Sequence, residues 1–134
     1  MSNIEVIVRC RGRNDREVAS KSPVVVEIPQ EGGTTVSLAP ARSSASFLDQ
    51  INSKSYSVDK AYGSGSAQQE LYTQVAHPLV RDFLSGYNVT ILAYGQTGTG
   101  KTYTMCGGGF EQAALKDDAG IIPRVLVVLF QSLA

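Results

Sequence analysis

The sequence has no tryptophan, one histidine, two cysteines and two methionines among its 134 residues. Cys10 and Cys106 lie far apart and form no C-x-x-C pair, so the pattern indicates neither a cysteine-based metal site nor a disulfide scaffold. Such a pair favours reduced thiols in the cytosol or nucleus. His77 has no partner nucleophile or metal-ligand spacing around it, and we interpret it as a helix residue without a catalytic role.

An excess of charge of either sign is also absent, because twelve basic and twelve acidic side chains give a net charge of zero. No global field therefore draws the chain to nucleic acid or to a membrane. No apolar run approaches membrane-spanning length, and Glu5 comes too early for a secretory hydrophobic region. We therefore expect an intracellular, soluble chain. With 43% hydrophobic residues, the composition predicts one globular domain at most.

The most informative feature that is present is a glycine-rich segment of the form G-x-x-x-x-G-K-[ST]. Glycines permit close approach of the backbone, so consecutive N–H groups can surround an anion such as a triphosphate. The motif predicts that Lys101 bridges the β- and γ-phosphates and that the Thr102 hydroxyl binds Mg²⁺. The alternative is a flexible surface loop with an incidental lysine. The segment is Gly95, Gln96, Thr97, Gly98, Thr99, Gly100, Lys101 and Thr102.

The residues on both sides of this loop favour the phosphate-binding interpretation. Residues 88–94 are β-branched and apolar almost throughout, which predicts a central strand covered on both faces. Residues 101–105 are expected to continue as a helix. Such an arrangement is typical of an α/β domain whose nucleotide lies at the carboxyl end of a central strand.

The rest of the chain alternates between strand and helix patterns. We expect strands over 4–8 and 56–62, a small hairpin over 24–28 and 34–38 outside the main sheet, and an irregular segment over 39–55 with a possible helical turn at Phe47 and Leu48. Apolar residues at three- and four-residue spacing predict a helix over 67–84, kinked at Pro78. A surface loop over 107–118 and an apolar helix from residue 120 to the end complete the expectation.

Residues 86–105 strongly resemble the phosphate-loop signature of kinesin motor domains. Further matches occur in family order: Val6-Ile7-Val8-Arg9-Cys10-Arg11, then Gly63 with Gln68 and Tyr72, then Ala119-Gly120-Ile121-Ile122-Pro123-Arg124. Within the family, the start of the chain looks most like the BimC-type (kinesin-5 class) mitotic kinesins of fungi. Residues 1–134 are therefore expected to form the N-terminal portion of a kinesin motor domain, a P-loop NTPase-type α/β fold whose central, mostly parallel sheet is flanked by helices and is incomplete at its C-terminus.

The resemblance implies an ATP-driven microtubule motor with ATP and Mg²⁺ as cofactors. It places Arg9 and Arg11 beside the adenine and Tyr103 near its other side. Gly12 and Ser64 stand where many kinesins have proline, so the chain departs from the family pattern on the adenine side. The implied partners are microtubules, which the motor contacts through segments outside this sequence, and self-association of the full-length motor is also implied. The implied location is the spindle and cytoskeleton. No nucleic acid or membrane partner is expected.

Three functional hypotheses remain open, because the sequence contains only part of what phosphoryl transfer requires. Phosphoryl transfer also needs an aspartate that organises Mg²⁺ and elements that sense the γ-phosphate. The sequence contains no segment of the form N-x-x-S-S-R-S-H or D-L-A-G, which carry those switches in kinesins, and no microtubule-binding helix is expected. The first hypothesis is the parent motor activity. The second is a nucleotide-binding module or truncated product without turnover, and the third is an unrelated P-loop kinase or NTPase. No complete catalytic set is expected in this chain alone.

Overall fold

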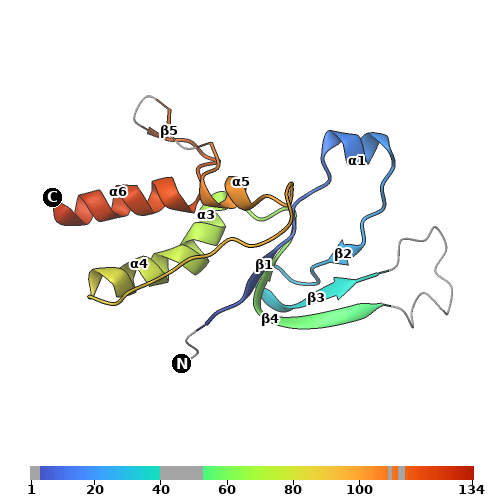
Figure 1. Ribbon diagram of the computed structural model, residues 1–134, viewed down its shortest axis with the longest axis horizontal. Helices are drawn as coiled ribbons and strands as arrows, with labels where there is room; N and C mark the ends of the chain where they lie inside the picture. Colours follow the sequence, from blue (N-terminus) through green and yellow to red (C-terminus); the bar gives the residue numbers. More distant parts are fainter. Residues whose placement is uncertain (1–3, 40–52, 109, 112–113) are drawn as a thin grey trace. The chain divides into compact units, whose positions relative to one another are not determined.

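A computed structural model of the chain describes residues 4–39, 53–108, 110–111 and 114–134 (Figure 1). The chain divides into two compact units, Met1–Gly65 and Ser66–Ala134, which are described separately below. The helical turn expected at Phe47 and Leu48 lies outside the described residues. Within the described segments, no helix has the length and apolar character needed to cross a bilayer.

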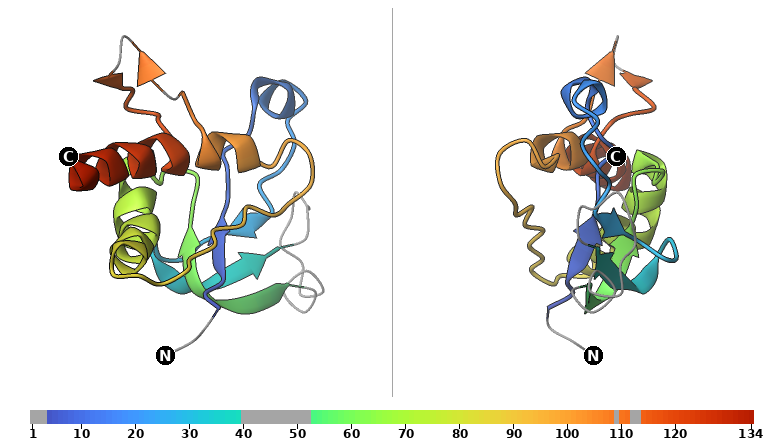
Figure 2. Two further views of the ribbon diagram at one scale, coloured as in Figure 1. Left: turned by 60° about the vertical axis from the view of Figure 1, so that its left-hand side comes forward. Right: turned by 90° about the vertical axis from the view of Figure 1, so that its right-hand side faces the viewer.

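The first unit is built on one curved, four-stranded sheet (Figure 2). Strand β1 is parallel to β4, whereas β2 and β3, and β3 and β4, pair antiparallel. The expected hairpin forms, but it belongs to this sheet and is not separate from it. The sheet is mixed in the part of the chain that the structure describes, and not mostly parallel as expected. Its strands are β1 (Ile7–Arg9), β2 (Val26–Glu27), β3 (Gly33–Leu38) and β4 (Lys54–Tyr62), in the order β1-β4-β3-β2.

The core of this unit lies at the carboxyl end of β4. Ala61 and Tyr62 are fully buried there, and Val36 of the neighbouring strand is 6% exposed. The first residues of β4 are exposed, so only the carboxyl end of this strand belongs to the core. Beyond β4, the Glu31 carboxylate accepts the Gly63 N–H at 2.8 and 3.0 Å, which fixes the turn that follows the strand.

A short helix, α1 (Asp15–Ala19), follows β1 and was not expected from the sequence. Its start is a capping box: the Asn14 side chain accepts the Glu17 N–H at 2.9 Å, and the Glu17 carboxylate accepts the Asn14 N–H at 2.9 Å. These reciprocal bonds satisfy two backbone donors that a helix start otherwise leaves without partners.

The second unit is mainly helical, and its long helix changes from α-helix to π-helix and back immediately before Pro78. Pro78 has no N–H to donate and its ring clashes with the carbonyl four residues earlier, so regular α-helix cannot continue through it. The chain accommodates Pro78 with a turn of π-helix, η1, placed immediately before α4. The helices are α3 (Gln68–Leu71), η1 (Tyr72–Ala76), α4 (His77–Leu84), α5 (Lys101–Met105) and α6 (Ile121–Leu133).

The loop between α5 and α6 contains a small hairpin that the sequence did not indicate. Strands β5 (Phe110–Glu111) and β6 (Ala114–Leu115) pair antiparallel, and a bridge between Gly107 and Ala119 closes the base of the loop. Helix α6 matches the expected final helix. It is buried at its start, through Ile121 and Arg124, and exposes apolar side chains toward its end.

The central strand expected over 88–94 is wrong for the described chain. The segment is extended, but it forms no ladder with any strand in the described ranges. Val89 and Ile91 are half-buried and line an apolar groove of about 290 Å³ with side chains of α4 and α6, whereas Leu92 and Tyr94 are 83% and 95% exposed. A strand requires a hydrogen-bonded neighbour, and no described segment of this unit supplies one.

Candidate functional site

The glycine-rich segment forms a compact loop between the extended segment 88–94 and α5. Gly98 and Gly100 have φ angles of 85° and 100°, in the left-handed region that side chains with a Cβ rarely adopt. Gly100 is also the residue before the first turn of α5, so its conformation directs the chain from the loop into the helix. The glycines of the motif are thus required by the backbone path.

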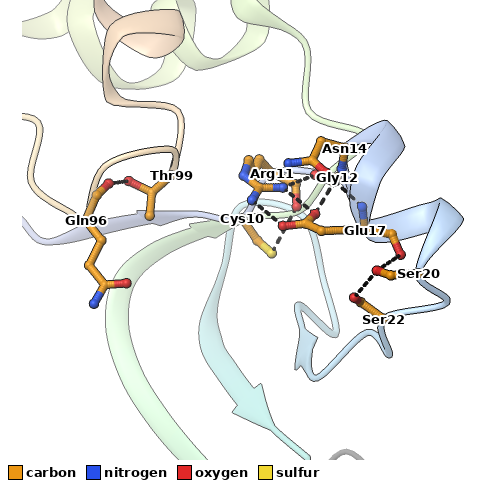
Figure 3. A network of polar contacts seen from close by, with 9 residues as sticks. All are labelled: Cys10, Arg11, Gly12, Asn14, Glu17, Ser20, Ser22, Gln96 and Thr99. Carbon is orange, nitrogen blue, oxygen red and sulfur yellow. Dashed lines mark hydrogen bonds and ion pairs between the residues drawn. The ribbon is translucent and has the colours of Figure 1, made fainter.

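Side chains of the loop close it from within. The Lys101 ammonium donates to the Gly95 carbonyl at 2.5 Å, across the span of the loop. The Thr99 hydroxyl donates to the Gln96 carbonyl at 2.6 Å, and the Thr99 N–H donates to the same oxygen at 3.2 Å (Figure 3). These bonds order the loop from within and hold the Lys101 ammonium against its backbone.

The residues present fit a magnesium-bound phosphate group. The Lys101 side chain is half-buried and its ammonium is held at the loop, where a point charge can meet phosphate oxygens. The Thr102 hydroxyl is on the exposed first turn of α5, accessible to a cation that keeps most of its ligands as water and phosphate oxygen. Tyr103 is 49% exposed on the same helix.

Among the described residues, no group of three or more His, Cys, Asp or Glu side chains is arranged to hold a metal ion. Mg²⁺ bound by one hydroxyl together with phosphates belongs to a different kind of site, in which the nucleotide brings the metal.

Arg9 and Arg11 belong to the first unit, whereas the loop belongs to the second. Arg9 ends β1, and Arg11 forms a two-bond ion pair with Glu17 of α1 at 2.7 and 2.8 Å (Figure 3). Arg11 also donates to the Gly12 carbonyl at 2.8 Å. These bonds lie in the plane of the guanidinium and fix its orientation, while stacking on an aromatic base uses the faces of that plane.

The ion pair leaves an electrostatic signature on Glu17. The hydrogen bonds from Arg11, and then the Asn14 N–H, lower the pKa of the Glu17 carboxyl to about 2. Next to this pair, partial burial raises the pKa of the Cys10 thiol, which the Arg11 charge offsets in part. The low reactivity of a neutral thiol agrees with the interpretation of Cys10 as a packing residue.

The sequence indicated every residue of the loop. It missed two polar side chains that organise local contacts, Glu17 in the first unit and Gln68 in the second. Glu17 was identifiable in principle from the Asn14-x-x-Glu17 spacing of a capping box. Gln68 was noted only as part of the family pattern, and its structural partners are 35 and 50 residues away, so no local signal reveals its role.

Comparison with known proteins gives consistent matches over nearly the whole chain. A family model described as the kinesin motor domain matches residues 9–134. Among curated proteins, "Kinesin-like protein CIN8" of Candida glabrata is 49% identical over 98% of this chain, and the protein of the same name in Saccharomyces cerevisiae is 48% identical over 98%. "Kinesin-like protein bimC" of Emericella nidulans is 47% identical over 99%. The chain spans about 13%, 13% and 11% of the lengths of these three relatives.

Proposed function

The chain belongs to the kinesin motor domain family, most like the fungal BimC-type mitotic motors, and from this premise we propose that it is the ATP-binding part of a microtubule-based motor. The observation that carries the proposal is the closed phosphate loop within a family match that begins at Arg9 and extends to Ala134. Kinesin motor domains have a P-loop NTPase fold, and we propose that the complete domain has the mostly parallel sheet expected from the sequence.

The nucleotide contacts are assigned from the loop outward. Backbone N–H groups of the segment Gly95–Thr102 surround the phosphates, Lys101 neutralises their charge, and the Thr102 hydroxyl is the protein ligand of Mg²⁺. Bound Mg²⁺ offsets the negative charge that develops during phosphoryl transfer. Arg9, Arg11 and Tyr103 are assigned to the adenine side on the family resemblance alone.

The motor activity itself is a proposal about the parent protein. Relatives named as kinesins support movement on microtubules coupled to ATP hydrolysis, with tubulin as partner and the spindle and cytoskeleton as location. Within its 134 residues, this chain carries neither switch motif, so we propose that it binds nucleotide without turning it over. Family membership leaves no support for an unrelated P-loop kinase.

The role of Thr102 provides a selective test of the proposed chemistry. ADP affinity is measured by calorimetry with excess Mg²⁺ and again with excess chelator, for the wild type, Thr102→Val and Thr104→Val. Thr104 is on the same helix and serves as the matched control. We expect Thr102→Val to weaken Mg·ADP binding about tenfold while metal-free ADP binding is unchanged. Equal affinities of Thr102→Val and Thr104→Val for Mg·ADP would contradict the assignment.

Turnover is tested on the same protein. Phosphate release from Mg·ATP is followed with and without microtubules, with Lys101→Ala as the control for contaminating ATPase. We expect wild type and Lys101→Ala to release phosphate at the same background rate. Turnover that depends on Lys101 would show that the chain is an ATPase by itself and would refute the proposal of binding alone.

A further inference from the structure

The helix that carries Lys101 and Thr102 is too short to be stable alone. Helix α5 has five residues, and isolated helices of this length do not form in water because the first turn is costly to nucleate. The last carbonyls of a helix also lack partners within the helix itself. Contacts from other elements of the second unit must therefore hold α5 in place.

Gln68 of α3 provides such a contact. Its side chain is 5% exposed, and its Nε2 atom donates to the Tyr103 carbonyl at 2.7 Å and to the Asp118 carbonyl at 3.0 Å. The Tyr103 carbonyl belongs to the last turn of α5 and the Asp118 carbonyl to the returning end of the loop between α5 and α6. One amide thus caps the short helix and joins it to the point where the chain comes back.

The base of the loop is held together around the same carbonyl. The Asp118 oxygen also accepts the Gly108 N–H at 3.1 Å, and the Cys106 carbonyl accepts the Gly120 N–H at 3.0 Å. The next carbonyl along the chain, that of Ala119, accepts a hydrogen bond from Nε of the Arg124 guanidinium at 2.9 Å. The hydrogen bonds at the base of the loop therefore hold the Asp118 carbonyl in place, and the Gln68 amide links α5 to this carbonyl.

The absence of a side chain at Gly107 makes space for the Gln68 amide. A Cβ at Gly107 would lie 1.9 Å from the Asp118 oxygen and 2.9 Å from the Gln68 Nε2 atom. Any side chain at this position would displace either the carbonyl or the amide. Gly107 and Gln68 are thus parts of one arrangement, although they lie on different elements.

We propose that Gln68 is a positioning residue of the phosphate site. By fixing the Tyr103 carbonyl, it holds the five-residue helix α5, and with it Lys101 and Thr102, in the conformation that binds phosphate. This inference rests on the proposed nucleotide-binding function. A positioning role differs from a general stabilising role because it affects the contacts to phosphate and Mg²⁺. Binding of a ligand that consists of those groups alone should therefore reveal the positioning role.

The first experiment compares Gln68→Leu with Gln74→Leu, a change at an exposed glutamine one turn and a half further along the same helical segment. Binding of Mg·ADP and of Mg·pyrophosphate is measured by calorimetry below the unfolding transition of each variant, followed by circular dichroism. We expect Gln68→Leu to weaken both ligands by the same factor, on the order of tenfold, and Gln74→Leu to match wild type. Unchanged affinity in folded Gln68→Leu would overturn the proposal.

The second experiment uses Gln68→Glu, which keeps the shape and remains informative if Gln68→Leu does not fold. An ionised carboxylate cannot donate to two carbonyl oxygens, but a protonated carboxyl can donate to one, and burial beside carbonyls raises the pKa of such a group. Mg·ADP affinity relative to wild type should therefore recover as the pH falls from about 8 to about 6. If the ratio of Mg·ADP affinities between Gln68→Glu and the wild type does not change with pH, the positioning role is contradicted. A wild type that binds neither ligand would instead refute the proposed function.

Discussion

At the scale of single residues, the best-defined electrostatic contact is the Arg11–Glu17 ion pair. Both of its bonds are short, and the Glu17 carboxylate also completes the capping box of α1. One carboxylate therefore holds a helix start and an arginine side chain at the same time. Its contribution should depend on pH in a defined direction.

The Glu17 pKa is lowered from an ordinary 4.5 to about 2 in the folded chain. A depressed pKa contributes stability that is fully present above pH 4.5 and is lost as the pH falls toward 2, because the unfolded state then binds the extra proton. Glu17→Gln should lower the thermal midpoint at neutral pH and reduce its fall across this acid range. Thermal melts followed by circular dichroism at several pH values measure this.

Glu70→Gln provides the control, because Glu70 is also a helix carboxylate and accepts a long bond of 3.4 Å from the Gln74 side chain. It should change the midpoint less than Glu17→Gln does. If the two variants melt alike at every pH, the Glu17 network does not stabilise the fold.

Prediction from sequence was possible for residues whose proposed chemistry depends on local spacing. The loop from Gly95 to Thr102 was indicated residue by residue because its offsets alone define the motif. Gln68 could not be assigned in the same way. Its two acceptors are 35 and 50 residues away, and only the folded chain brings them within reach of one amide.

At the scale of secondary structure, the passage from the phosphate loop into α5 depends on the conformation of Gly100. Its φ of 100° is disfavoured for residues with a Cβ by about 1–2 kcal/mol. Gly100→Ala should therefore favour other conformations of the free loop and weaken Mg·ADP binding about tenfold. Calorimetry on the folded variant gives the affinity directly.

Gly65→Ala is the matched control for Gly100→Ala. A Cβ at Gly65 meets nothing within 4 Å, and this residue has no positive φ. We expect it to bind Mg·ADP as the wild type does. Similar losses in Gly65→Ala and Gly100→Ala would mean that the left-handed conformation is not what the loop requires.

Helices and strands depend on different information for their prediction, and the reason is physical. The helices over 101–105 and from 120 onward were recognised because their hydrogen bonds are local. The segment 88–94 has the composition of a central strand, but a strand needs a neighbour, and none of the described segments pairs with it. Helix α1 was missed because its five residues carry no apolar period, only the spacing of its cap.

At the scale of the whole molecule, the notable property is exposed apolar surface in the second unit. Leu92 and Tyr94 lie on the open side of an extended segment, and Phe130 and Leu133 of α6 are 70% and 77% exposed. Extended backbone without a paired neighbour and contiguous apolar side chains both promote association. The isolated chain should therefore self-associate as its concentration rises.

Leu92→Lys tests this prediction, with Thr90→Lys as control, because both positions are on the exposed side of the same segment. Light scattering coupled to gel filtration should show concentration-dependent mass for the wild type and Thr90→Lys, and a smaller mass for Leu92→Lys. A wild type that is monodisperse at all concentrations and melts cooperatively would contradict the prediction.

The central claim is that this chain carries a preformed phosphate site of the kinesin type. Titration of Mg·ADP into the purified chain by calorimetry, with Lys101→Ala as the paired variant, tests it most directly. We predict saturable binding by the wild type and none by Lys101→Ala, because Lys101 supplies the only side-chain charge of the loop. Equal binding by both proteins, or no binding by a folded wild type, would contradict the claim.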